Sequence, residues 1–165
     1  MSRNVERTAY ELALHAWAES VVPSGWDVIF ADADGARPKA KYVLLNVIAF
    51  SMVGHGENRV LDQVFGDECL GELQHHYEGT CSVAIFGSSA RTVVETLRRS
   101  IDLPSVQEST GDDDLSLVGS SDSLNQTELE GTRSVPRFQT DVFFHWSDVT
   151  YYEAEVIETV TMTRT

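Results

Sequence analysis

Long stretches in which apolar and polar residues alternate constrain the fold of this chain more than any other feature. Residues 72–86, 137–146 and 150–163 each show this period of two, which is typical of a β-strand with one covered face. Residues 147–149, Ser-Asp-Val, predict a turn that joins the last two stretches into an antiparallel hairpin. The apolar face of the first stretch carries Leu73, Tyr77, Cys81, Val83 and Ile85, and that of the second carries Phe138, Val142, Phe144 and Trp146.

Another long strand is predicted over residues 41–53, where both alternating faces are apolar, as in a strand covered on two sides. Residues 54–71 have glycines near both ends, and we expect them to form the projecting end of a long hairpin, with residues 60–65 extending one arm. A short strand over residues 26–30 precedes them and runs into a turn at residues 32–35.

Apolar residues recur at helical spacing in two segments, residues 4–22 and 89–101. Pro23 closes the first helix, and Gly87-Ser88-Ser89 supplies a cap for the second. The length of 165 residues corresponds to one domain. The element order therefore predicts a single α+β domain over residues 1–165, with a mostly antiparallel sheet, long hairpins and two helices packed on one face.

The segment 105–132 is unusual because it contains seven Asp and Glu and no Lys or Arg. We expect a long, flexible acidic loop there, with a short strand around Leu115, Leu117 and Val118. The whole chain has 26 Asp and Glu against 12 Lys and Arg, a formal net charge of −14. This excess argues against a protein that grips nucleic acid through its phosphates and against an anionic membrane surface as partner.

The chain shows no signs of secretion or membrane insertion. The first 17 residues mix charged and apolar side chains, unlike a signal peptide. The longest apolar run, residues 42–53, is interrupted by Asn46 and Ser51 and is too short for a membrane helix. Cys69 and Cys81 do not make a disulfide framework in a chain of this length, so we expect a reducing cytosolic origin.

No pattern of catalytic or metal-binding residues emerges. His75 and His76, near Cys69 and Cys81, come closest to a metal cluster, but adjacent residues of a strand point to opposite faces. Residues 32–35 and 112–114 lack the spaced acids of a calcium loop, and residues 87–89 lack the surroundings of a nucleophilic serine. We therefore predict no metal, no cofactor and no enzymatic activity. The alternatives from other classes are a small metal-dependent hydrolase using His55, His75 or His76, and an acidic mimic of nucleic acid.

Two long hairpins expose more strand than the core of a small domain requires. Long edge strands need a partner to cover them. We therefore expect an assembly protein whose subunits pair in a closed ring through heterologous interfaces.

Two segments carry a resemblance to a known family. Residues 77–103, YEGTCSVAIFGSSARTVVETLRRSIDL, combine an alternating strand, a glycine and an amphipathic helix. Residues 137–163 contain an Arg-x-Gln-x-Asp-Val-x-Phe run followed by an acidic turn. Together with the N-terminal helix, roughly over residues 8–163, the chain resembles the tail-terminator or neck proteins of long-tailed viruses of bacteria and archaea.

The resemblance implies an α+β protomer that assembles as a hexameric ring on the last ring of the tail tube. There it would stop tube growth and offer the surface to which the filled head docks, with no enzymatic activity and no cofactor. Its partners would be the tail-tube protein and the head–tail connector proteins, in a virion assembled in the host cytoplasm. A head-completion or stopper ring of the same neck is the alternative.

The acidic charge fits such a ring, because DNA must pass through it without adhering. We hypothesise that some of Asp112, Asp113, Asp114, Glu128 and Glu130 face the channel. Scarce lysine and abundant acid also resemble proteins that work at high salt, which suggests a halophilic host. At 1 M salt the Debye length is only about 3 Å, so self-repulsion would cost little.

Overall fold

A mixed β-sheet with helices on one face organises the molecule. The computed structural model describes residues 7–33, 37–38, 41–65, 68–130 and 133–154. The elements in these ranges are α1 (Ala9–Val21), β1 (Asp27–Phe30), β2 (Tyr42–Phe65), β3 (Glu68–Phe86), α2 (Ala90–Ser100), α3 (Pro104–Gly111), β4 (Leu115–Ser120), β5 (Leu124–Asn125), β6 (Glu128–Glu130), β7 (Arg133–Val135) and β8 (Arg137–Ala154).

The strand order in the main sheet is β1-β2-β3-β8-β4, and β5 pairs separately with β8. All these pairings are antiparallel except that of β1 with β2, while β6 and β7 form a small hairpin of their own. The predicted α+β class with a mostly antiparallel sheet is confirmed.

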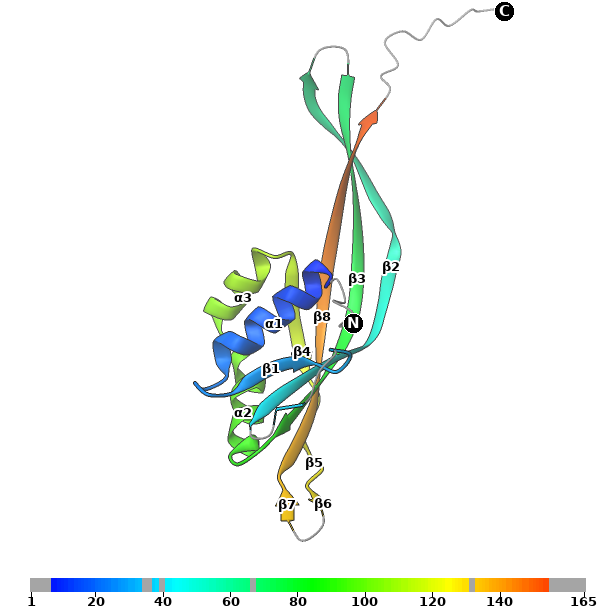
Figure 1. The fold of residues 1–165 in the computed structure, drawn as a ribbon. Coiled ribbons are helices and arrows are strands. Elements are labelled where there is room, and N and C mark those ends of the chain that lie inside the picture. The colour runs from blue at the N-terminus through cyan, green and yellow to red at the C-terminus, as the bar shows by residue number, and fades with distance from the viewer. Residues whose placement is uncertain (1–6, 34–36, 39–40, 66–67, 131–132, 155–165) are drawn as a thin grey trace, which may run out of the picture.

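The core lies between one face of the sheet and the helices, which Figure 1 shows on the same side of the strands. Helix α1 buries Trp17, whose indole nitrogen donates a hydrogen bond of 3.1 Å to Ser100 Oγ of α2. The apolar faces predicted for residues 72–86 and 137–146 face this core where the helices cover them. Their fully buried members are Cys81, Val83, Ile85, Val142 and Phe144.

Beyond the helices, β2, β3 and β8 continue together as a narrow three-stranded projection (Figure 1). We call this part, residues 51–65, 68–78 and 146–154, the ribbon. In it, residues 69–77 of β3 pair with residues 146–154 of β8, a length of about 30 Å at the usual rise per residue.

The turn predicted at residues 147–149 is wrong. These residues lie inside the continuous strand β8, where Ser147, Asp148 and Val149 pair with β3. None of the three adopts a positive φ, and the extended backbone lets β8 keep pairing along the whole arm of β3. The predicted return strand is therefore a continuation of β8 up to Ala154, and its residues 155–163 lie outside the described part.

The loop expected over residues 105–132 is also different in the structure, which places α3, β4, β5 and β6 there. Helix α3 starts with Pro104 at its first turn, a position that proline favours. The Gln107 side chain donates hydrogen bonds to the carbonyls of Ile101 and Leu117, at 2.7 and 2.8 Å, and so holds α3 against β4. The short strand expected around Leu115 and Leu117 is confirmed.

Coverage of β2 on both faces, as predicted for residues 41–53, holds only at its start. Tyr42 and Val43, which point to opposite faces, are both buried, but Ile48 and Met52 are 55% and 53% exposed. The reason is that the helices end here and β1 pairs with Tyr42–Leu45 only. The predicted helices correspond to α1 and α2, although Ser89 at the start of α2 makes no side-chain capping hydrogen bond.

Candidate functional site

Stacked aromatic rings mark the point where the ribbon leaves the helical body. The Tyr10 ring of α1 stacks on Phe50 of β2 at a centroid distance of 4.3 Å, and Phe50 stacks on Tyr77 of β3 at 4.9 Å. Trp146 of β8 lies 5.5 Å from Tyr77, and Phe144 lies 5.9 Å from Tyr10. Because α1 and all three ribbon strands contribute to this cluster, it fixes the direction in which the ribbon projects.

The ribbon exposes apolar side chains and free backbone edges. Met52, Val53 and Tyr151 are 53%, 43% and 62% exposed. In the described part, β2 pairs with a strand on only one side beyond Leu45, whose carbonyl accepts one further hydrogen bond from Ala31. Likewise, β8 pairs with a strand on only one side beyond Trp146, and Ser147 donates one hydrogen bond to the carbonyl of Asp114. Unpaired edges next to exposed apolar residues are typical of a surface that another chain covers.

A second exposed apolar area lies on the sheet face away from the helices. Phe143 is 43% exposed there, because its neighbours Val142 and Phe144 point into the core. With Val118 of β4 and Ala49 of β2 it lines a shallow hollow across the sheet. The hollow is open to solvent and holds His145, which lies 3.6 Å from Glu78.

The histidines do not converge. His75 lies against Gly56, whereas His76 Nδ1 is 2.9 Å from Ser147 Oγ, so the two rings point to opposite faces as predicted. Within the described ranges, no group of three or more His, Cys, Asp and Glu side chains is arranged to hold a metal ion. Burial raises the pKa of the Cys81 thiol to about 12, which makes it an inert core residue.

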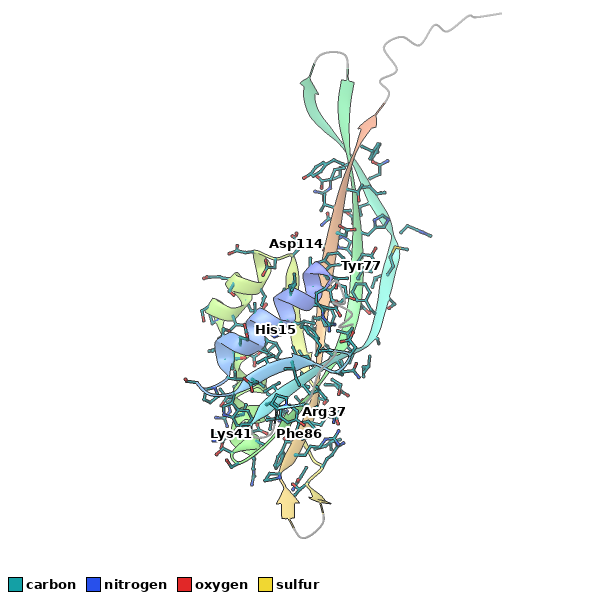
Figure 2. All side chains as sticks on the ribbon, viewed as in Figure 1. His15, Arg37, Lys41, Tyr77, Phe86 and Asp114 are labelled. Carbon is teal, nitrogen blue, oxygen red and sulfur yellow. The ribbon has the colours of Figure 1, made fainter. Side chains whose placement is uncertain are left out.

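The five acids proposed to face a channel occupy two places. Asp112, Asp113 and Asp114 are exposed in the turn between α3 and β4, where the backbone carbonyl of Asp114 accepts a hydrogen bond from Ser147 at 3.2 Å. This turn therefore lies at the root of the ribbon, as Figure 2 shows for Asp114. Glu128 and Glu130 belong to β6, at the opposite end of the molecule (Figure 1).

The structure gathers basic residues that look scattered in the sequence. Residues 37–45, 80–94 and 133–140 contain six Lys and Arg and no Asp or Glu. In the described part, the first segment opens β2, the second closes β3 and begins α2, and the third forms β7 and opens β8, so they meet at the end of the sheet farthest from the ribbon. We call this surface, formed by Arg37, Lys41, Arg91 and Arg137 with the half-buried rings of Trp26 and Phe86 beside the buried Tyr42, the basic end.

Contacts across the strands order the basic end. Tyr42 pairs with Phe86, and Phe86 with Arg137. The Tyr42 and Phe86 rings stack at 4.6 Å, and the guanidinium carbon of Arg137 lies 5.1 Å from the centre of the Phe86 ring. Lys41 Nζ lies 5.9 Å from the Trp26 ring centre. In the sequence, this basic surface could be suspected only from the absence of Asp and Glu in three separate segments. Strand pairing is what brings these segments together.

Ion pairs elsewhere link the helices to the turns. Arg7 donates hydrogen bonds of 2.6 and 3.1 Å to Asp32, and these bonds hold the pKa of that carboxyl below its ordinary value. The Ser123 hydroxyl and Arg98 likewise hold the pKa of Glu95 below its ordinary value. These interactions fasten surface elements to the body and do not line a cavity.

Comparison with known proteins identifies one family. The sequence family described as phage neck terminator protein matches residues 11–165. No curated protein shows significant similarity to the chain. Among the described helices, none has the length and apolar character to cross a membrane.

Proposed function

The chain belongs to the phage neck terminator protein family and is thus a structural component of the virion neck, and from this premise we propose that it forms a ring that caps the tail tube. The ring joins the tail to the head and lets DNA pass through its centre. The ribbon is the observation that carries this proposal, because a projecting arm with exposed apolar residues and unpaired edges needs other subunits or neck proteins to cover it.

The aromatic cluster at the root of the ribbon supports a specific geometry of assembly. A ring closes only when every subunit meets the next at the same angle. Stacking of Tyr10, Phe50 and Tyr77 ties the ribbon to α1, so the ribbon keeps one angle to the body. The neighbours in the assembly would be further copies of the chain, the tail-tube protein below and the head–tail connector above.

The acidic groups suit the wall of a DNA channel. Exposed carboxylates repel the phosphate backbone, so DNA slides past without binding. Because the structure separates Asp112–Asp114 from Glu128 and Glu130, the two groups would line the channel at two levels. A structure of the assembled ring with both groups on its outer wall would refute this part of the proposal.

Particles that lack the protein provide the decisive experiment. Electron micrographs of such particles should show overlong tails, because nothing stops polymerisation of the tail tube. Tails of normal length on heads that leak DNA would instead identify a head-completion or stopper ring. The mass of the purified chain in solution, alone and with tail-tube protein, tests the ring directly.

Catalysis by the ribbon histidines has a simple test. The hydrolase alternative requires His55, His75 or His76 to act together with a metal, but His75 and His76 face opposite ways. Bound metal found by elemental analysis, together with an activity lost in His75→Ala, would support that alternative over the structural role.

A further inference from the structure

Acids predominate in the ribbon, and exposed bases gather at the other end of the same strands. The ribbon contains seven Asp and Glu and one Arg, which are Glu57, Asp62, Glu68, Glu72, Glu78, Asp148, Glu153 and Arg59. The basic end lies at the opposite end of the same three strands and holds the described bases Arg37, Lys41, Arg91 and Arg137. Asp27 of β1 and Glu128 and Glu130 of the β6–β7 hairpin lie at this end as well. We propose that the ribbon of one copy docks on the basic end of the next copy. This contact rests on the proposed ring and specifies how its subunits meet.

Three bases of the basic end are exposed to a partner. Arg37, Lys41 and Arg91 are exposed, and no described carboxylate lies within ion-pair distance of them. Figure 2 shows Arg37, Lys41 and Phe86 at the end away from the ribbon. Since the chain as a whole has a charge of −14, an exposed cluster of bases is the part of its surface that attracts another copy most strongly.

The ribbon offers the complementary surface. Glu72 lies directly opposite Tyr151 across the strands, so an acid and an exposed aromatic side chain are neighbours. Val53, which pairs with His76 on the same face as Glu72, adds exposed apolar area on the adjacent strand. The basic end likewise combines bases with aromatic rings, and an interface needs both kinds of match because its apolar groups supply affinity while its charges select the register.

Covering the basic end also agrees with the passage of DNA. Bases next to aromatic rings would hold nucleic acid if they faced the channel uncovered. An acidic ribbon laid over them removes that attraction. The competing occupant of the basic end is therefore duplex DNA, and the experiment below distinguishes the two.

Charge reversal in the full chain tests the contact at about 0.15 M salt, with mass measured by analytical ultracentrifugation. One variant combines Arg37→Glu and Lys41→Glu, and a second combines Glu72→Lys and Glu78→Lys. Each alone should weaken self-association by about tenfold or more, since like charges then face each other. An equimolar mixture should associate again, because the unchanged ribbon of the first variant meets the unchanged basic end of the second, and the two reversed surfaces match.

Control variants change charge elsewhere. Asp102→Lys with Glu108→Lys alters two exposed acids of the helical side and matches the second variant in charge, and Arg99→Glu alters an exposed base of α2 by half the charge change of the first variant. Both should associate like the wild type. Circular dichroism establishes that all variants are folded.

The outcomes separate the contact from the ring. Variants that associate like the wild type, or a mixture that stays dissociated, would overturn the contact while the ring could stand. Loss of duplex DNA binding in Arg37→Glu/Lys41→Glu with unchanged mass would overturn it in favour of DNA. A restored species with the mass of a dimer supports the contact but contradicts the ring, and a wild type that stays monomeric with tail-tube protein contradicts both.

Discussion

The ring of Phe144 in β8 lies directly over Gly79 in β3, its partner in the strand register. A Cβ atom at position 79 would overlap the phenyl ring. The same relationship recurs in the ribbon, where Tyr152 covers Gly71. In both places a glycine leaves the space that lets a large ring lie flat across the neighbouring strand.

Substituting Ala for Gly79 should therefore destabilise the protein. The added methyl group displaces the fully buried Phe144 ring, and such overpacking costs about 1 to 3 kcal/mol of unfolding free energy. Gly119→Ala is the matched control in β4, because nothing lies within 4 Å of its added Cβ. Urea unfolding measures the unfolding free energy of both variants, and equal losses of unfolding free energy in the two would contradict the packing role of Gly79.

Ser100→Ala should loosen the contact between α1 and α2. The buried Trp17 indole N–H would lose its acceptor, and an unsatisfied buried donor costs about 1 to 3 kcal/mol. Ser109→Ala, an exposed position in α3, should change the unfolding free energy by less than about 0.5 kcal/mol. If Ser100→Ala costs no more than this control, the hydrogen bond contributes nothing measurable.

Asp32→Asn should remove a pH-dependent part of the stability. Arg7 lowers the folded-state pKa of Asp32, so the stabilisation is complete above the ordinary value of 3.8 and disappears as pH falls through the folded value. Because the Asp32 side chain is 57% exposed, the difference from wild type at pH 7 should be at most about 1 kcal/mol. Unfolding curves from pH 7 to about pH 3 should converge, and a constant difference would contradict this assignment.

The thiol of Cys81 should be unreactive until the protein unfolds. A pKa of about 12 instead of 9.0 lowers the thiolate fraction by about a thousandfold at pH 8. The Cys69→Ser variant leaves Cys81 as the one thiol, and a colorimetric disulfide reagent reports its rate of reaction. Rapid labelling of the folded variant would mean that the core around Cys81 opens readily.

Stability should rise with salt because the net charge of −14 repels itself. Raising NaCl from about 0.1 M to 1 M shortens the Debye length from about 10 to about 3 Å. We expect the unfolding free energy to rise by about 1 kcal/mol, which corresponds to an increase of about 2 to 4 °C in Tm. Neutralising Asp112, Asp113 and Asp114 to Asn should reduce the gain, and a Tm independent of salt would argue against adaptation to a halophilic host.

The parts of the fold that the sequence predicts correctly have strong local periodicity. Residues 72–86 alternate so regularly that their buried face is evident, and α2 has an apolar stripe at helical spacing. The segment 105–132 was misjudged because α3 is short and polar, with a single buried residue, Thr110. Its position depends on hydrogen bonds from Gln107 to distant carbonyls, which no local pattern reveals.

The turn expected at Ser147, Asp148 and Val149 failed for a related reason. Polar turn-forming residues also occur in strands when a partner strand supplies their backbone hydrogen bonds. Here β3 is that partner and extends far enough to pair with all three residues. The length of β8 was therefore decided by the length of β3, not by the residues of β8 itself.

By itself, the sequence determined the type of each long element, the buried faces of α2 and of residues 72–86, and the acidic excess of the whole chain. These properties depend on the spacing of neighbouring residues and on simple counts. The tertiary structure alone decided where the charges lie, because pairing of β2, β3 and β8 brings described bases from three segments together at one end and the acids of the ribbon together at the other. An acidic chain thereby acquires a basic end, since strand pairing joins residues that lie far apart in the sequence.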